Sequence, residues 1–237
     1  MPPWDFLLIF LFLTVVLPWR GRMRIRQLLA RPYVSSAERL TLYAATIIFQ
    51  WLLVAVTAWR CWTRGVNAAQ LGLGPFDGRP ILLLSLAGTI SLGILHWFNL
   101  RRIGHLSPEL HGQLHEFAKR VLPRTSVEML LYFALSLTAA TCEEFLYRGF
   151  VMAALARLGW PLWIIVAASA AMFGLAHLYQ GRGGVTSTCL LGLVFGWVRI
   201  AYGSLIPVMV WHAVVDVIAG IAGRRYLLPR EQEPLSS

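Results

Sequence analysis

Residues 141–149 read TCEEFLYRG, and they lie inside a long apolar run that extends from Val127 to Leu158. Glu143, Glu144 and Arg148 place three charges within six positions in the middle of this run. A charged side chain at bilayer depth costs about 2.5–3.5 kcal/mol on insertion scales, so charges in such a run usually mark function. The stretch therefore predicts a functional site built within a hydrophobic helix.

The spacing of these charges separates the two acids. On a helix, Glu144 and Arg148 are four residues apart, share one face and can form an ion pair. Glu143 is rotated by about 100° from Glu144, so it does not share that arginine. We expect Glu144 to serve the structure and Glu143 to be available for chemistry.

The composition indicates a polytopic membrane protein. Of the 237 residues, 57% are hydrophobic and 14% are charged, and the mean hydropathy is +0.63. This is too apolar for a soluble domain. The apolar runs are continuous and do not alternate with polar residues, which argues against a membrane β-barrel. We predict an all-α fold, a transmembrane helical bundle with about seven spans and one interfacial amphipathic helix.

The expected spans are separated by short polar or turn-rich connections. The first run is shorter than the ~20 residues that a span usually needs, and its basic residues follow it, which is the wrong order for a cleaved signal peptide. The sequence Ser-Pro-Glu at residues 107–109 is a helix-start signal, and it predicts the interfacial helix. The spans cover residues 4–19, 40–59, 81–98, 127–158, 161–178, 186–201 and 205–222.

The net charge of +10 raises the possibility of nucleic acid binding, but the basic residues cluster in the short loops between apolar runs. That pattern is typical of topology signals and of contact with anionic lipid headgroups. We therefore expect no nucleic acid partner, and anionic lipids at the cytoplasmic face. The expected location is a bacterial inner (plasma) membrane, with the N-terminus outside and the C-terminus in the cytoplasm. The loop after the first run is the strongest cytoplasmic mark and carries Arg20, Arg22, Arg24, Arg26, Arg31 and Arg39.

The chain is expected to divide into three parts. Residues 1–125 would form the N-terminal membrane helices and the cytoplasmic interfacial helix. Residues 126–223 would form a helical core around Glu143, Glu144 and Arg148, the part of the chain that the family resemblance given below implies is catalytic. Residues 224–237 would form a cytoplasmic tail.

Three more polar residues fall within apolar spans of the C-terminal part. His177 follows Phe173 by four positions, and Asp216 follows His212 by four, so each pair lies on one helix face. A helix rise of 1.5 Å per residue puts Glu143 and His177 at about the same depth, with His212 within a few ångströms of it. The sequence therefore predicts that a carboxylate, two imidazoles and a second carboxyl converge in the cytoplasmic half of the membrane. A glutamate general base with imidazole partners suits the activation of water for hydrolysis.

Three ordered motifs in these spans resemble those of the CAAX-protease and bacteriocin-processing (CPBP, or Abi) family. They read EExxxR at residues 143–148, FxxxH at 173–177 and HxxxD at 212–216. Members of that family are intramembrane endopeptidases related to the type-2 CAAX prenyl protease. The resemblance covers about half of the chain, from residue 127 to residue 223.

The resemblance implies a role for each of four residues. Glu143 would be the general base that activates water together with His177, while His212 and residue 216 would stabilise the oxyanion. Family members often carry asparagine at that last position, where this chain has Asp216. An ionised aspartate cannot donate to an oxyanion, so Asp216 is either protonated or orients His212. We favour orientation, because a carboxylate beside an imidazole usually fixes the ring tautomer.

The expected enzyme is a CAAX-type, glutamic-type endopeptidase that cleaves a membrane-embedded or lipidated protein or peptide without a cofactor. The remaining motif residues, Glu144, Arg148 and Phe173, would support the site. The nearest alternative is a zinc metalloprotease, with the metal held by the four reactive residues. Against it, the chain has no HExxH helix. Two further alternatives are a non-catalytic membrane scaffold with the same fold and a transporter, although no inverted repeat supports transport.

Overall fold

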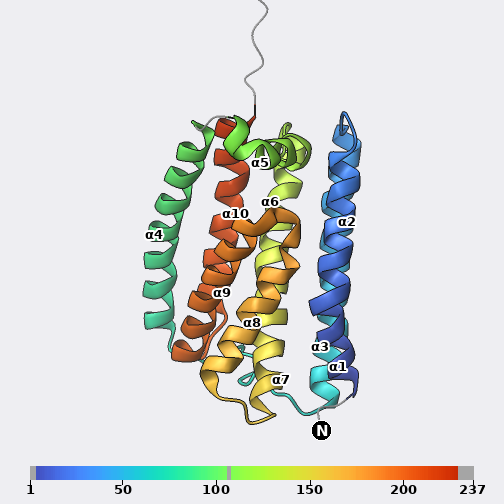
Figure 1. The fold of residues 1–237 in the computed structure, drawn as a ribbon. Coiled ribbons are helices and arrows are strands. Elements are labelled where there is room, and N and C mark those ends of the chain that lie inside the picture. The colour runs from blue at the N-terminus through green and yellow to red at the C-terminus, as the bar shows by residue number, and fades with distance from the viewer. Residues whose placement is uncertain (1–3, 106–107, 229–237) are drawn as a thin grey trace, which may run out of the picture.

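A computed structural model describes residues 4–105 and 108–228, and only the backbone for residues 108–114. Long helices stand side by side as a bundle, and α5 lies across the end at which α10 finishes (Figure 1). Six helical segments are long and apolar enough to cross a membrane, and α8 is a shorter apolar helix, so the predicted multi-pass helical bundle is confirmed. The elements are α1 (Trp4–Leu11), η1 (Phe12–Val16), α2 (Leu17–Leu29), α3 (Ser36–Thr63), α4 (Gly78–Gly104), α5 (Pro108–Val121), α6 (Ser126–Glu144), η2 (Phe145–Val151), α7 (Met152–Ala156), α8 (Leu162–Ala176), η3 (Leu178–Gln180), α9 (Gly181–Tyr202) and α10 (Ile206–Leu227).

The N-terminal segment is longer than the sequence predicted. Helices α1, η1 and α2 form one helical segment, Trp4–Leu29, in place of a short span that ends at residue 19. The prediction of an arginine-rich loop is wrong for Arg20 to Arg26, which continue the helix with exposed side chains. Arginine is a good helix former, and extending an existing helix is favourable, so the basic residues prolong the helix beyond its apolar part.

Arg39 also lies on a helix, and it is buried. Its Nε and Nη2 atoms donate to the Oε2 and Oε1 atoms of Glu128 on α6 at 3.0 and 2.9 Å. Its Nη1 donates to the Val34 carbonyl at 2.6 Å. The Oε2 atom of Glu128 additionally accepts the backbone N–H of Arg124 at 2.6 Å. This ion pair ties α3 to α6, so Arg39 is a structural residue and not a loop charge.

Glycines allow α9 to approach its neighbours closely. A Cβ atom at Gly196 would lie 2.9 Å from Val166 on α8. At Gly192 it would lie 3.2 Å from the Cα atom of Ala170 and 2.9 Å from Nη2 of Arg148. Helices within membranes pack tightly where such small residues meet. Gly192 therefore makes the space that the Arg148 guanidinium fills.

The two ends of the C-terminal part differ in how well they match the prediction. The helix that the sequence placed at the interface is present as α5, although its expected N-cap, Ser107, lies outside the described residues. Helix α10 continues to Leu227, so the expected tail from residue 224 begins inside this helix, and residues 229–237 lie outside the described part. Helix α1 begins at the opposite end of the bundle from the end at which α10 finishes (Figure 1).

Candidate active site

The two adjacent acids lie where the helix geometry changes. Helix α6 ends at Glu144, and the next seven residues form the π-helical stretch η2, all of them buried. Short π-helical insertions in α-helices occur frequently at functional sites. The Ser169 hydroxyl of α8 donates to the Tyr147 carbonyl at 2.8 Å and ties this stretch to the neighbouring helix.

Glu144 holds two partners through one oxygen. Its Oε1 atom accepts from Arg148 Nη1 at 3.1 Å, which confirms the predicted ion pair. The same oxygen lies 2.9 Å from Nδ1 of His212 on α10. A carboxylate only accepts hydrogen bonds, so we assign the proton of this contact to Nδ1. Glu144 therefore fixes the orientation of the His212 ring, in addition to pairing with Arg148.

Asp216 does not make the bond that the sequence predicted for it. Its Oδ2 atom lies 3.7 Å from His212 Nε2, which is longer than a hydrogen bond. The hydrogen bond that the prediction assigned to Asp216 is absent, and Glu144 on α6 bonds the other ring nitrogen of His212 instead. Asp216 instead lies beside Nε2, one helical turn along α10.

The two carboxylate oxygens of Glu143 have different surroundings. Oε1 accepts a hydrogen bond from Nε2 of Gln50, on α3, at 2.9 Å. Oε2 is buried without a hydrogen-bond partner in the described structure, and lies 3.9 Å from His177 Nε2 and 4.0 Å from His212 Nε2. These separations exceed a direct hydrogen bond and are of the size that a shared water molecule bridges. One oxygen is thus held in place, and the other faces two imidazoles.

His177 is oriented by the backbone. Its Nδ1 atom lies 2.8 Å from the Phe173 carbonyl, which can only accept, so Nδ1 carries the proton and Nε2 is directed toward Glu143. The Phe173 ring lies 4.7 Å from the His177 ring and 5.8 Å from the His212 ring, and the Arg148 guanidinium lies 4.1 Å above its face. Phe173 therefore forms an apolar wall that contacts both imidazoles and the buried cation.

The four reactive residues predicted from the sequence lie together in the structure. The support residues are more deeply buried than the reactive ones. The side chains of Glu144 and Arg148 are 0% exposed, whereas that of Glu143 is 20% exposed and that of Asp216 is 33% exposed. The support residues thus form the sealed side of the site. The side with Asp216 and Glu143 is the accessible one.

The arrangement is wider than a zinc site. Adjacent ligand atoms around a tetrahedral Zn²⁺ with bonds of about 2.1 Å are ~3.4 Å apart, whereas Glu143 Oε2 is 3.9 and 4.0 Å from the two histidine nitrogens. Among the residues that the structure describes, no group of three or more His, Cys, Asp or Glu side chains is placed to hold a metal ion. As arranged, Glu143 Oε2 and the two histidine nitrogens are therefore farther apart than the ligand atoms of a bound zinc ion.

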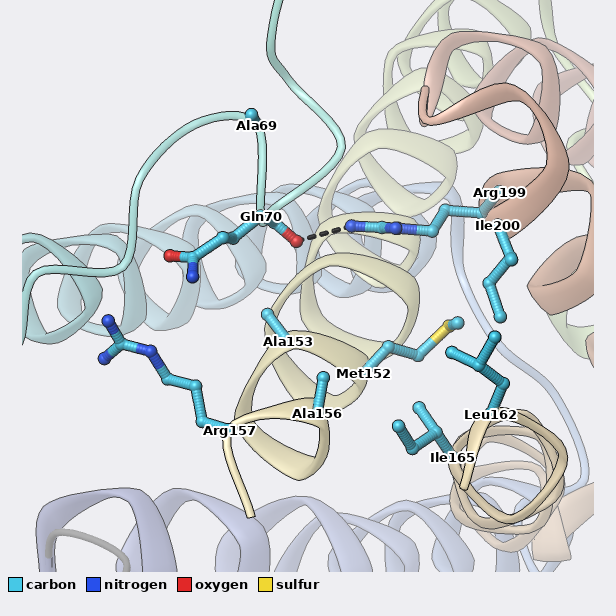
Figure 2. A pocket seen from close by; sticks show the side chains of 10 residues that line it. All are labelled: Ala69, Gln70, Met152, Ala153, Ala156, Arg157, Leu162, Ile165, Arg199 and Ile200. Atoms are coloured by element: carbon cyan, nitrogen blue, oxygen red, sulfur yellow. Dashed lines mark hydrogen bonds between the residues drawn. The ribbon is translucent and has the colours of Figure 1, made fainter. Parts of the chain in front are cut away.

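A hollow lies between the loop after α3 and helices α7, α8 and α9, and it lacks the reactive side chains of the site described above. It has a volume of about 290 Å³, and Figure 2 shows Arg157 and Arg199 among its ten lining side chains. Arg199 donates to the Gln70 carbonyl, and Arg157 donates to the carbonyls of Arg64 and Gly65 at 2.8 and 2.7 Å. The ten lining residues include no acid, histidine, serine or cysteine. This hollow lacks the groups for hydrolysis, and its arginines attach the loop after α3 to the bundle.

Gln50 is the site residue that the sequence analysis missed. It belongs to the N-terminal part of the chain, where no motif was found. A signal was nevertheless present, because Gln50 is an amide in the middle of the apolar run at residues 40–59. Polar side chains at that depth usually contact other polar groups inside the bundle.

Comparison with known proteins agrees with the motifs. Residues 125–218 match the family model described as "Type II CAAX prenyl endopeptidase Rce1-like". No curated protein and no solved structure matches the chain. The match confirms the resemblance: the chain carries an Rce1-like domain of the CAAX protease family, within a multi-pass integral membrane protein. Gln50 lies outside the matched residues.

Proposed function

We propose that this protein is an intramembrane endopeptidase in which Glu143 activates a water molecule to hydrolyse a peptide bond. The observation that carries the proposal is the position of Glu143 Oε2, which has no hydrogen-bond partner among the described residues and faces Nε2 of both His177 and His212 at 3.9 and 4.0 Å. A general base must reach the proton that it abstracts directly or through one water. A water among these three atoms contacts both an acceptor carboxylate and an imidazole.

The first step is the attack of water on the peptide carbonyl. Glu143 Oε2 takes a proton from the water, and the remaining hydroxide forms a bond to the carbonyl carbon. His177 accepts a second hydrogen bond from the water at Nε2, because its own proton is held at Nδ1 by the Phe173 carbonyl. The water is thereby oriented by two acceptors on different helices.

The negative charge that develops on the carbonyl oxygen requires a donor. His212 in its protonated form supplies Nε2–H, while its Nδ1–H remains bound to Glu144. The charge of Glu144 stabilises this imidazolium, and Asp216 at 3.7 Å from Nε2 adds to that stabilisation. When the tetrahedral intermediate collapses, Glu143 returns its proton to the leaving amine, and the C–N bond breaks.

The surroundings of the site support a proposal for the substrate class and for the orientation in the membrane. The site lies within a helical bundle of membrane-spanning length, so we propose a membrane-embedded or lipidated protein or peptide as substrate. The end of the bundle with α5 also carries Arg20 to Arg26 and the basic last turns of α4 and α10. By the positive-inside rule we place this end at the cytoplasm, in contact with anionic lipids.

The test is the Glu143→Gln variant. The amide preserves shape but does not accept a proton, so we expect hydrolysis to fall by about 10²–10⁴-fold or more, with normal folded yield. Glu116→Gln on α5 is the matched control, because Glu116 pairs with Lys119 at 3.0 Å outside the spans. Substrates are found as membrane peptides that accumulate uncut with Glu143→Gln in a mass-spectrometric comparison. Cleavage by purified Glu143→Gln protein at the wild-type rate would refute the proposal.

Dependence on metal is tested separately. The separations around Glu143 Oε2 are wider than those of a zinc site, so we expect hydrolysis to continue after extended treatment with a strong chelator. The measurement is the rate before chelation, after chelation, and after Zn²⁺ is restored. Loss of activity that only added metal restores would favour the zinc metalloprotease over the glutamic mechanism.

A further inference from the structure

We infer that Gln50 is a positioning residue for Glu143, which it holds with one carboxylate oxygen fixed and the other directed at the two histidines. This inference rests on the proposed function, because it assigns Gln50 a role through the general base. It extends the active site to α3, outside the residues that match the family model.

The contact between the two side chains is specific. Gln50 Nε2 donates to Glu143 Oε1 at 2.9 Å, across 93 positions of sequence. The other end of the amide, Oε1 of Gln50, is buried without a hydrogen-bond partner in the described structure. The orientation of the amide is therefore set by the carboxylate: a flipped amide would place two acceptors against each other.

The consequence for Glu143 follows from the freedom of its last torsion. The terminal carboxylate torsion of glutamate is broad and weakly restricted, so packing alone does not select one orientation. The bond from Gln50 removes that freedom by holding Oε1 toward α3. Oε2 is then presented to Nε2 of His177 and His212, which lie on the opposite side. Because displacement of a catalytic group by about 1 Å can cost 10²-fold in rate, loss of this restraint should appear in kcat.

A purely structural role in joining α3 to α6 is the competing explanation. The same two helices are already joined by the Arg39–Glu128 ion pair and by a 3.3 Å hydrogen bond from Trp51 Nε1 to Thr138 Oγ1. The Trp51–Thr138 contact lies one position from Gln50 on α3 and does not touch Glu143. Thr138→Val is therefore a matched control that removes one α3–α6 hydrogen bond with little change in shape.

The experiment compares kcat and KM for Gln50→Leu, Gln50→Glu and Thr138→Val, on a peptide substrate identified with the Glu143→Gln protein. We expect Gln50→Leu to lower kcat by about 10- to 100-fold with little change in KM. Gln50→Glu keeps the length of the side chain but replaces the donor with a second carboxylate, so its loss should be at least as large. Thr138→Val should keep the wild-type kcat.

The outcomes are separable. Wild-type kcat in Gln50→Leu, or an equal loss in Thr138→Val, would overturn the positioning role. If Gln50→Leu does not fold, Gln50→Asn keeps an amide that is one methylene too short, and its kcat must also fall. Glu143→Gln measured in parallel tests the proposed function itself: full activity there removes the premise. Combining Gln50→Leu with Glu143→Gln should cause no further loss, because a positioning residue has no effect once its target is gone.

Discussion

Two buried arginine–glutamate pairs in this molecule are satisfied to different degrees. In the pair of Arg39 and Glu128, all three guanidinium nitrogens donate, and both carboxylate oxygens accept. In the pair of Glu144 and Arg148, one contact of 3.1 Å is made, while Nε and Nη2 of Arg148 and Oε2 of Glu144 have no hydrogen-bond partner in the described structure. The first pair joins two helices. The second lies beside His212.

We infer from this difference that the Arg39–Glu128 pair serves the fold and that the Glu144–Arg148 pair serves the proposed site. A buried polar atom left unbonded costs about 1–3 kcal/mol, so a pair selected for stability alone would be bonded like that of Arg39 and Glu128. The Arg148 guanidinium instead faces the rings of Phe173 and Phe195 at 4.1 and 5.6 Å. The Oε1 atom of Glu144 contacts both Arg148 and His212, and its Oε2 atom is hydrogen-bonded to neither. We interpret this pair as support for an imidazolium, retained at a cost in stability.

The largest expected effect comes from breaking either pair on one side. Arg148→Ala and Arg39→Ala each leave a buried carboxylate without the arginine that compensates its charge, which costs about 3–5 kcal/mol of folding free energy. We expect a sharp fall in folded protein in detergent extracts for both. The double variant Glu144→Gln/Arg148→Met should recover folded yield but not hydrolysis. Glu128→Gln/Arg39→Met should recover both. A Glu144/Arg148 double variant with wild-type turnover would contradict the distinction.

An intermediate effect is expected at Gly192. A Cβ atom there would approach Nη2 of Arg148 to 2.9 Å and Ala170 to 3.2 Å, so Gly192→Ala forces the guanidinium or α8 to move. Overpacking of this kind typically costs about 1–3 kcal/mol. Thermal unfolding in detergent should show a lower midpoint than for Gly183→Ala, where a Cβ atom meets nothing within 4 Å. Equal midpoints would mean that Arg148 is not confined.

The smallest effect is expected for Asp216→Asn. Asp216 makes no hydrogen bond to His212, whose tautomer is fixed by Glu144. The change therefore removes only a nearby charge, and an asparagine N–H can donate toward the oxyanion. We expect turnover to stay within about one order of magnitude of wild type. A loss of 100-fold or more, measured on a defined substrate across pH 5 to 9, would restore the orienting role for Asp216.

Much of the site could be predicted because helical spacing determines which residues share a face. The four-residue spacing predicted the ion pair of Glu144 and Arg148. The helix rise per residue predicted that Glu143, His177 and His212 lie at about the same depth. Spacing within one helix does not show which helix approaches from outside it. The contact from Glu144 to His212 and the contact from Gln50 to Glu143 both cross between helices, and neither could be derived from a local pattern.

The fold was predictable to the extent that hydropathy reports it. Apolar runs located the spans, but their ends were misplaced where a helix continues into polar sequence, as at Arg20 to Arg26. Arg39 was misread for a related reason. The sequence analysis took its charge as a sign of a cytoplasmic loop. Arg39 is instead buried because it pairs with Glu128, which is 89 residues away in the chain.

The most direct test of the account is the turnover per folded molecule of two matched variants, Glu144→Gln and Glu128→Gln. Each neutralises the acid of one buried pair without changing its shape. We expect Glu144→Gln to lose about 100-fold or more in kcat, because His212 loses the charge that stabilises its protonated form. Glu128→Gln should be less stable but keep the wild-type kcat. Wild-type turnover in Glu144→Gln, or an equal loss in Glu128→Gln, would contradict it.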